Sequence, residues 1–590
     1  MIAPRSTGRR LSVTVLVVFA VIVLFGIRLV DLQVVRAAEL TAQADSRRDI
    51  TVTTYGTRGA IVDAEGAVLA SSVDRFDITA SPQNVDLEIT WMTVDGERAQ
   101  VPTGEAIAAI AGLTGVSAAE LLAVLTEDPE SNFAYLAREV DLATFDAVRA
   151  LGISWVYSEP HPARTYPNGA VAGNLVGFEG TDEPLAGLER SEDACVAAEN
   201  GSTSYERGAD GVRIPGSTIV EEEPVDGGTL HLTIDSDLQW YAQQVLAREG
   251  GRLGAEWATA MIVRVDSGEI VAAADWPSID PNDLNSVAAD DAGARSFVAP
   301  FEPGSIMKPA TFASLLDAGV ITPGTQVIAG DRYTTGLPAG YFIRDSTAHG
   351  DLRYTAAGVL ANSSNTGTAV LSERLDVEAR SAYLEAFGFG SATAVDFLGE
   401  VENSGFVADP ATVDSITAVT QQFGQGMTAT SAQLVSMYQT LGNGGVRMPL
   451  TLVAGCELPD GSWTDLPDTE GVRVVSEYAA DTTVAMMEST VTSGTLQGLV
   501  NIPGYRIAGK TGTAEVAEGG VYTDDRIISV AGLVPADDPQ YAVVVTFAKP
   551  ATIKWSSAAA PAFTEIVKQV IKTAGIAPSN SAPASFPLTW

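Results

Sequence analysis

The stretch Phe301–Phe312, FEPGSIMKPATF, decides both the fold and the chemistry of this chain. Pro303-Gly304 precedes a helical run, so Ser305 is expected in the first turn of a helix. Residues three apart in a helix share a face, which places Lys308 beside the Ser305 hydroxyl. A helix start also offers free backbone N–H groups and the positive end of the helix dipole, and both suit a developing oxyanion.

Lys308 is informative because lysine is rare in this chain. Only six of the 590 residues are lysines, and among them Lys308 alone has a serine three residues upstream. A serine hydroxyl is a weak nucleophile until a base takes its proton, and a lysine is such a base only when burial or a nearby cation lowers its pKa. Arginine, which fills most basic positions here, cannot lose its proton. The pattern predicts Ser305 as nucleophile and Lys308 as its base.

A second motif lies in AGKTGTAE, where Lys510-Thr511-Gly512-Thr513 is typical of a strand. Gly512 has no side chain, so we predict that a substrate backbone lies directly against that strand. The hydroxyls of Thr511 and Thr513 are predicted to hold a carboxylate, and Lys510 adds positive charge.

A third motif lies between these two, in LANSSNTGTAVL. Ser363 is a candidate proton relay, and the amide of Asn365 is a candidate group for binding a peptide. Each motif alone is weak evidence because such short patterns arise by chance. All three in one chain, in this order, predict a serine acyl-transfer site.

The amino terminus predicts a membrane anchor over residues 11–30. Arg5, Arg9 and Arg10 precede seventeen uncharged residues, Leu11–Ile27, which span about 25 Å as a helix. The arginines predict a cytoplasmic tail at 1–10 and the bulk of the chain outside the cell membrane. A cleaved signal peptide is the less favoured alternative, because the apolar run is long and the nearest Ala-x-Ala lies far beyond it.

The rest of the chain is expected to form two folded parts. A length of 590 residues exceeds one core, and a net charge of −39 argues against binding nucleic acid. We predict an elongated α+β module at 31–225, an α/β domain at 226–575 and a mobile Pro/Ser-rich tail at 576–590. Local patterns predict hairpins within 58–82 and around 266–269, helices within 104–151, and a helix starting at Asp235 or Ser236.

The cysteines and histidines add little chemistry. Cys195 and Cys456 suit an oxidising compartment, but we expect them in different domains, buried and unpaired rather than disulfide-bonded. His161, His231 and His349 are isolated, with no zinc-ligand spacing, so no metal site is predicted. His349 precedes the Ser363 motif and is expected to make an ordinary polar contact.

The three motifs are those of penicillin-binding proteins and serine β-lactamases, and the chain resembles a class B penicillin-binding protein over nearly its whole length. The further matching stretches are RGAIVDAEGAVLA, with Ala64 where a basic residue is common, PSIDPND, QQFGQGMTATSAQL, GNGG and AGLVPADDPQYAVVV. The resemblance implies an anchor and pedestal followed by a transpeptidase domain, whose antiparallel sheet is flanked by helices as in serine β-lactamases.

The resemblance also implies a role for each site residue. Ser305 would attack the penultimate D-alanine of a stem peptide, and Lys308 would be its base. Ser363 would pass protons to the leaving amine, and Asn365 would bind the peptide. The terminal carboxylate would be held by Lys510, Thr511 and Thr513, with Gly512 beside the substrate. The N–H groups of Ser305 and Thr513 would form the oxyanion hole. β-Lactams would acylate Ser305, and no cofactor is implied.

Several relatives of this family are disfavoured. A bifunctional class A enzyme needs a glycosyltransferase motif that the sequence lacks, a β-lactamase is normally short and unanchored, and a β-lactam sensor needs more membrane spans. An inactive scaffold is expected to have lost a motif residue. Septal and side-wall synthesis both stay open, although the compact carboxy terminus favours the septum. The resemblance implies partners: lipid-linked precursor, a SEDS-type glycan polymerase and other divisome proteins.

Overall fold

The structure is a computed structural model that describes residues 7–40, 49–180, 183–206, 214–284, 288 and 292–590. Two compact units emerge from its internal packing. One contains residues 1–57 and 198–226, and the other contains residues 58–197 and 227–590. This division differs from the predicted 31–225 module, because residues 58–197 pack with the carboxy-terminal part of the chain.

The first unit contains the predicted anchor. Helix α1 (Thr7–Val30) continues as a π-helical turn, η1 (Asp31–Val35). Within the described residues, Gly8–Val35 is one straight helix that is long and apolar enough to cross a bilayer. The unit also holds an antiparallel sheet of β1 (Asp49–Thr54), β10 (Gly201–Glu206) and β11 (Ile219–Glu222).

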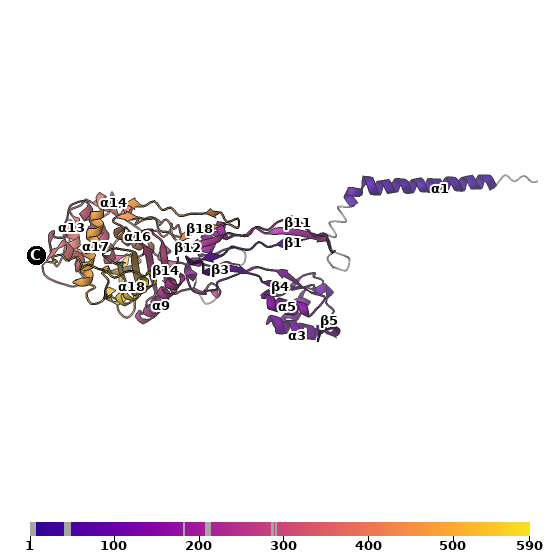
Figure 1. Ribbon diagram of the computed structural model, residues 1–590, viewed down its shortest axis with the longest axis horizontal. Coiled ribbons are helices and arrows are strands. Elements are labelled where there is room, and N and C mark those ends of the chain that lie inside the picture. The colour runs from indigo at the N-terminus through magenta and orange to yellow at the C-terminus, as the bar shows by residue number, and fades with distance from the viewer. Residues whose placement is uncertain (1–6, 41–48, 181–182, 207–213, 285–287, 289–291) are drawn as a thin grey trace, which may run out of the picture. The chain divides into compact units, whose positions relative to one another are not determined.

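A small subdomain of the second unit has its own apolar core, and its elements cluster together in Figure 1. Its central strand β4 (Phe76–Ala80) pairs with β7 (Ala134–Val140) and β8 (Val156–Pro160). Helices predicted within 104–151 are present, but β7 interrupts them. The other elements are η2 (Pro82–Asn84), the hairpin β5 (Ile89–Val94) and β6 (Glu97–Pro102), and helices α3 (Thr103–Thr114), α4 (Ala118–Glu127) and α5 (Leu142–Ala150).

A six-stranded sheet joins residues 58–197 to the rest of the second unit. Its order is β19 (Trp463–Thr464), β18 (Val453–Glu457), β12 (Thr229–Leu232), β2 (Ile61–Val62), β3 (Val68–Val73) and β9 (Ala163–Thr165). The β2–β3 pair confirms the hairpin predicted within 58–82. Residues of this sheet belong to the large apolar core of the second unit. The same core includes residues of three short helices, α6 (Gly173–Val176), α7 (Gly187–Ser191) and α8 (Asp193–Val196).

This junction corrects the prediction for the cysteines. Cys195 and Cys456 form a disulfide, with their Cα atoms 6.0 Å apart. Cys195 O accepts a hydrogen bond from Gly228 N, the residue just before β12. Cys456 lies in β18, which pairs with β12. The two cysteines were expected in different domains, but the sheet brings them together.

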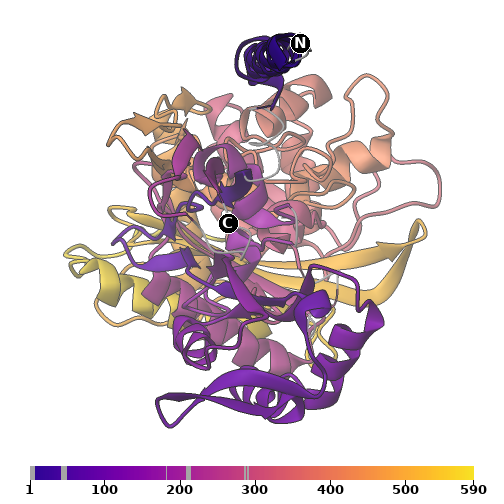
Figure 2. The ribbon, with the colours of Figure 1, turned by 90° about the vertical axis from the view of Figure 1, so that its right-hand side faces the viewer.

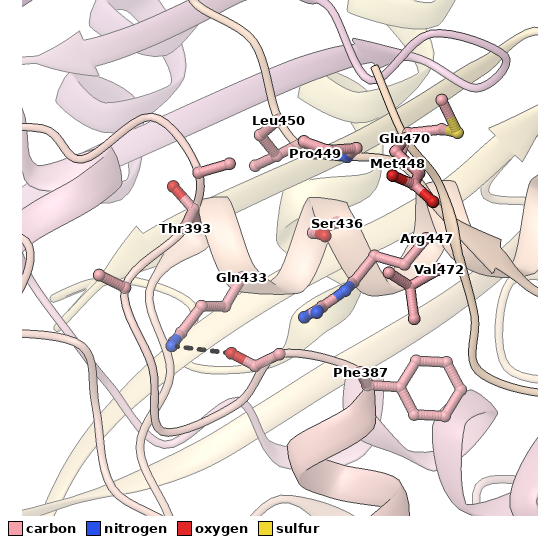
Figure 3. A pocket seen from close by; sticks show the side chains of 13 residues that line it. Phe387, Thr393, Gln433, Ser436, Arg447, Met448, Pro449, Leu450, Glu470 and Val472 are labelled. Carbon is pink, nitrogen blue, oxygen red and sulfur yellow. Dashed lines mark hydrogen bonds between the residues drawn. The ribbon is translucent and has the colours of Figure 1, made fainter. Parts of the chain in front are cut away.

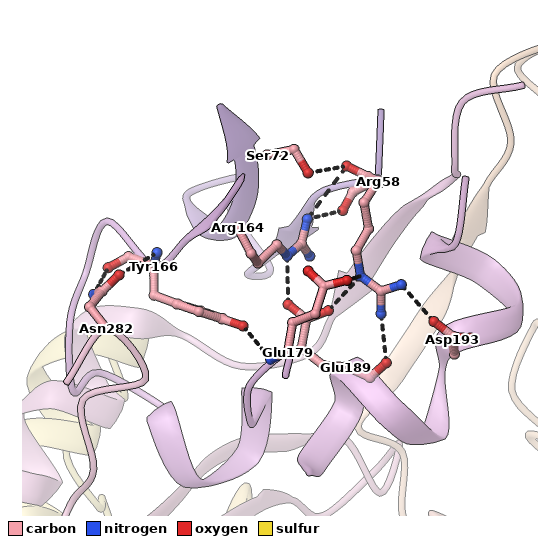
Figure 4. A network of polar contacts seen from close by, with 9 residues as sticks. Arg58, Ser72, Arg164, Tyr166, Glu179, Glu189, Asp193 and Asn282 are labelled. Carbon is pink, nitrogen blue, oxygen red and sulfur yellow. Dashed lines mark hydrogen bonds and ion pairs between the residues drawn. The ribbon is translucent and has the colours of Figure 1, made fainter. Parts of the chain in front are cut away.

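A buried network of charged side chains supports the junction (Figure 4). Glu189, whose side chain is fully buried, accepts from Arg58 Nε at 2.9 Å and from Arg164 Nε at 2.7 Å. Asp193 accepts from Arg58 Nη1 at 2.6 Å. Because these groups lie on β9, α7, α8 and the approach to β2, the network ties four segments together.

The three predicted active-site motifs, those of Ser305, Ser363 and Lys510, lie around a five-stranded antiparallel sheet. Its order is β14 (Ile270–Trp276), β13 (Trp257–Arg264), β23 (Tyr541–Ala548), β22 (Val521–Val534) and β21 (Ala508–Glu518). The β13–β14 pair confirms the hairpin predicted around 266–269. The β21–β22 hairpin is the long gold ribbon in Figure 2, and β21 forms the edge of the sheet.

Helices cover both faces of this sheet. Helices α9 (Ser236–Leu253) and α18 (Ala560–Ala574) lie side by side on one face (Figure 1) and share an apolar core with it. Asp235 caps α9 through Leu238 N, as predicted. The opposite face carries α11 (Lys308–Asp317), α16 (Ser431–Gly442) and α17 (Glu477–Thr492).

The remaining elements surround these helices. They are α10 (Arg295–Val298), η5 (Gly304–Met307), β15 (Gln326–Ala329), β16 (Leu352–Thr355), α12 (Ala356–Ala361), α13 (Asn365–Ser372), α14 (Val377–Ala386), α15 (Ser415–Thr420), η6 (Gln421–Phe423), β17 (Val446–Arg447), β20 (Val472–Arg473) and η7 (Ser556–Ala559).

Candidate active site

The structure places Lys308 beside Ser305, as the sequence predicts. Ser305 lies in the 3-10 turn η5, and Lys308 is the first residue of α11. Lys308 Nζ is 3.0 Å from Ser305 Oγ, and the lysine side chain is fully buried whereas Ser305 is partly exposed. A buried amine facing an accessible hydroxyl is the arrangement that a lysine base requires.

The turn that carries Ser305 is packed against bare backbone. Gly304 has a φ of +58°, and a Cβ there would lie 2.8 Å from Thr513 O. A Cβ at Gly512 would lie 2.9 Å from Ile306 Cγ2 and 3.0 Å from Pro303 O. The turn that carries Ser305 therefore packs directly against Gly512. Gly512 allows β21 to approach Ser305.

Ser363 lies between the two buried lysines. Its Oγ is 3.3 Å from Lys308 Nζ and 2.8 Å from Lys510 Nζ, while its carbonyl accepts from Lys308 Nζ at 2.7 Å. Its φ of +60° is a left-handed conformation that is costly for a residue with a side chain. This conformation turns both oxygens of one residue towards the lysines. The predicted relay residue therefore contacts both.

Asn365 also contacts Lys308. Its Oδ1 accepts from Lys308 Nζ at 2.7 Å, and its Nδ2 donates to Arg344 O at 3.2 Å. Asn365 is partly exposed and begins α13. One N–H of its amide is therefore used within the protein, so a contact to a peptide depends on the other.

The two threonines of the Lys510 motif differ in the hydrogen bonds that they can offer to a ligand. Thr511 is buried, and its Oγ1 is 2.9 Å from Thr495 Oγ1. Thr513 is partly exposed, and its Oγ1 accepts from Ser556 N at 3.2 Å. Because that bond uses only a lone pair, the Thr513 hydroxyl keeps its hydrogen for an anionic ligand.

Burial sets the protonation of both lysines. It lowers the pKa of Lys308 to about 7, and the nearby Asp345 carboxylate opposes part of this shift. Burial, followed by repulsion from Lys308, lowers the pKa of Lys510 well below its usual value. A charge on one lysine disfavours a charge on the other, since both face Ser363. Lys308 can therefore be neutral near physiological pH.

Comparison with known proteins identifies the family. The chain matches the model of the penicillin binding protein transpeptidase domain over residues 258–572, and that of the penicillin-binding protein dimerisation domain over residues 53–182. The chain belongs to the class B penicillin-binding proteins. Its transpeptidase domain contains all three motifs, and its dimerisation domain covers most of residues 58–197.

Two relatives align with most of this class B penicillin-binding protein. Penicillin-binding protein PbpB of Mycolicibacterium smegmatis is 34% identical over 583 residues, which cover 94% of this chain and 89% of the relative. Peptidoglycan D,D-transpeptidase FtsI of Escherichia coli K12 is 30% identical over 555 residues, which cover 93% of this chain and 89% of the relative.

Solved structures of this fold also match. A peptidoglycan synthetase from Bifidobacterium adolescentis superposes with a TM-score of 0.72 at 28% identity, covering 92% of this chain and 100% of that chain. Penicillin binding protein 3 from Mycobacterium tuberculosis, complexed with aztreonam, gives a TM-score of 0.69 at 26% identity, with coverages of 91% and 100%. Both matches confirm the predicted fold of pedestal and transpeptidase domain.

The structure also adds a residue that the motifs do not include. Asp345 Oδ1 accepts from Asn365 N at 2.5 Å and from Thr366 N at 2.9 Å, so this carboxylate caps the helix that begins with Asn365. His349 Nε2 lies 3.0 Å from Asp345 Oδ2, which is the ordinary polar contact expected of that histidine. The only sequence signal was an aspartate 20 residues before Asn365, a spacing too long for a local motif.

A separate cavity of the transpeptidase domain lies around Arg447 (Figure 3). It measures about 130 Å³, and its lining includes Phe387, Gln433, Ser436 and Arg447. Ser305, Lys308 and Lys510 do not line it. The cavity around Arg447 is therefore separate from the candidate active site, which lies beside Ser305 at the edge strand β21.

Proposed function

We propose that this class B penicillin-binding protein cross-links peptidoglycan by acyl transfer through Ser305. The observation that carries the proposal is the hydrogen-bonded chain from Ser305 Oγ through Lys308 Nζ and Ser363 Oγ to Lys510 Nζ, with distances of 3.0, 3.3 and 2.8 Å. This chain links a nucleophile, a base and a relay in one path for a proton.

The first half-reaction uses the neutral form of Lys308. Lys308 Nζ takes the proton of Ser305 as Oγ attacks the carbonyl carbon of the penultimate D-alanine of a stem peptide. The N–H groups of Ser305 and Thr513 hold the oxyanion, a role that fits the close approach of Gly304 to the Thr513 backbone. The C–N bond then breaks, and Ser363 passes the proton to the departing D-alanine.

The second half-reaction reverses the proton path. The amine of a neighbouring stem peptide attacks the ester carbon, and its proton returns through Ser363 or Lys308 to Ser305 Oγ. Before acylation, the hydroxyl of Thr513, with Thr511 and Lys510 behind it, binds the terminal carboxylate of the donor, which then leaves with D-alanine. Asn365 binds the peptide in both half-reactions. β-Lactams enter the same path but leave a stable ester on Ser305.

Intact mass spectrometry of residues 37–590 after addition of benzylpenicillin tests this function. The expected result is a lasting adduct of one drug molecule, which the Ser305→Ala variant lacks. An adduct that vanishes within seconds while the drug is consumed would identify a β-lactamase. No adduct on folded protein would identify an inactive scaffold. Release of D-alanine from a pentapeptide substrate tests the transfer itself.

We also propose a cellular setting for this activity. Arg5, Arg9 and Arg10 favour a cytoplasmic amino terminus and an extracytoplasmic bulk, which reporter fusions at each end would test. We propose a septal role, with lipid-linked precursor and a SEDS-type glycan polymerase among its partners. Depletion should give filaments, whereas rounded cells would indicate side-wall synthesis. Co-purification with the polymerase, lost on replacing α1, tests the partner.

A further inference from the structure

The carboxy-terminal segment 579–590, expected to be mobile, is bonded to the transpeptidase domain along its length. We call it the strap. Its last residues pair with β16 through one isolated antiparallel bridge, between Tyr354 and Thr589. Beside this bridge, Thr355 N donates to Leu588 O at 3.1 Å and Trp590 N donates to Arg353 O at 3.3 Å. The Thr355 hydroxyl also donates to Pro587 O at 2.6 Å. This end of the strap therefore lies at the start of α12.

Gly358 shows how closely the strap approaches α12. A Cβ at this position would lie 1.8 Å from Leu588 O and 2.7 Å from the Leu588 carbonyl carbon. Glycine inside a helix is less favourable than alanine, so its presence here needs a reason. Passage of the strap backbone supplies that reason. In addition, Trp590 Nε1 donates to Val327 O at 3.3 Å, and Arg353 lies over the Trp590 ring.

The other end of the strap is bonded to the segment that leads into β21. Ser579 N donates to Gly504 O at 2.9 Å, and Arg506 N donates to Ser579 Oγ at 3.0 Å. Ala584 N donates to Glu488 Oε2 at 3.1 Å, and the same carboxylate pairs with Arg506. Lys510 follows Arg506 by four residues, so this end of the strap lies just before β21, the strand that carries the Lys510 motif.

Helix α12 connects the strap to the reacting groups. Its first turn contacts the strap, and Ser363 follows its last residue by two positions. At that far end, Ala361 O accepts from Thr495 N at 3.1 Å, and Thr495 is bonded to Thr511. A helix is rigid along its axis, so a shift at Gly358 is transmitted to Ser363.

We propose that the strap is a positioning element, which fixes α12 and β21 relative to each other and so holds Ser363 at bonding distance from Lys308 and Lys510. The inference rests on the proposed function. The strap bonds both to the start of α12, at Thr355, and to the segment just before β21, at Arg506. A strap that served stability alone would leave the chemistry at Ser305 unchanged.

The test is Gly358→Ala, which adds one methyl group in the path of the strap while keeping a good helix former. Its matched control is Gly251→Ala, a glycine in helix α9 with open space around it. A second route is Trp590→Ala, with the exposed Ser585→Ala as its control. Hydrogen exchange at Leu588–Trp590 reports whether the strap is released, and melting curves report whether each variant is folded.

The deciding readout is the kinetics of acylation by benzylpenicillin, measured well below the melting temperature. In both strap variants the first-order rate constant of acylation should fall about tenfold while the dissociation constant of the non-covalent complex stays nearly constant. The controls should stay within about twofold of wild type. A released strap with an unchanged acylation rate constant would overturn the proposal.

The outcome also separates this inference from the proposed function. If wild-type protein forms no adduct, the proposed function is refuted. Hydrogen exchange at Ser363–Gly367 would then test whether the strap positions Ser363. Faster exchange there in Gly358→Ala and Trp590→Ala, but not in the controls, supports positioning. Exchange that stays at the wild-type rate in both strap variants refutes it.

Discussion

Acylation of Ser305 is expected to depend on pH through the protonation of Lys308. Burial lowers the pKa of this lysine to about 7, so the neutral, basic form is about a tenth of the total at pH 6 and about nine tenths at pH 8. The acylation rate constant should therefore rise roughly tenfold between these values and then level off. Activity is present above the depressed pKa and is lost as the pH falls through it.

A charge change near Lys308 should move this midpoint in a known direction. The Asp345 carboxylate raises the pKa of Lys308 because it stabilises the ammonium form. Asp345→Asn keeps an oxygen for the N–H groups of Asn365 and Thr366 but removes that charge, so the midpoint should move to lower pH. Asp331→Asn is the matched control, since its side chain is 52% exposed.

Stopped-flow acylation with a fluorescent penicillin from pH 5.5 to pH 9.5 would measure both midpoints. A lysine with the ordinary pKa of 10.5 would instead give a rate that keeps rising about tenfold per pH unit across this whole range. Such a slope, or a profile that is flat from pH 5.5 upwards, would refute the argument that burial prepares Lys308 as the base.

Three further predictions concern stability and geometry. Keeping Lys308 neutral in the folded protein costs about 4–5 kcal/mol at pH 7. Lys308→Met removes this cost and should raise the free energy of unfolding by about 2 kcal/mol at pH 7. Between pH 7 and pH 10.5 the lysine is protonated in the unfolded chain but neutral in the folded one, so the stability of the wild type should rise with pH. The difference in free energy of unfolding between Lys308→Met and wild type should therefore be smaller in urea unfolding at pH 10 than at pH 7. Gly512→Ala should slow acylation at least tenfold and lower the free energy of unfolding by about 1–3 kcal/mol, because its methyl group pushes the turn that carries Ser305. An unchanged acylation rate would show that this turn moves aside without cost. Glu189→Gln should lower the free energy of unfolding by about 3–5 kcal/mol in urea, because it removes the buried negative charge that Arg58 and Arg164 share. A loss below about 1 kcal/mol would mean that water compensates for the lost charge.

Sequence alone predicted the features that depend on neighbours along the chain. The helix beginning after Asp235, the hairpins within 58–82 and around 266–269, and the strand containing Lys510 all follow from local turn, cap and periodicity rules, and all are present. The pairing of Ser305 with Lys308 also follows from helical spacing. These predictions succeeded because the interacting residues lie within a few positions of each other.

Tertiary structure decided what depends on residues far apart. The disulfide between Cys195 and Cys456 spans 261 positions, and it forms because residues 58–197 fold back against β12 and β18. The turn of Ser305 packs against the bare backbone of Gly512, which lies on a strand far along the chain. The strap looked like a mobile tail because its composition is Pro/Ser-rich, yet its backbone bonds to α12 and to the root of β21. No local pattern encodes these contacts, since each exists only after distant segments have packed together.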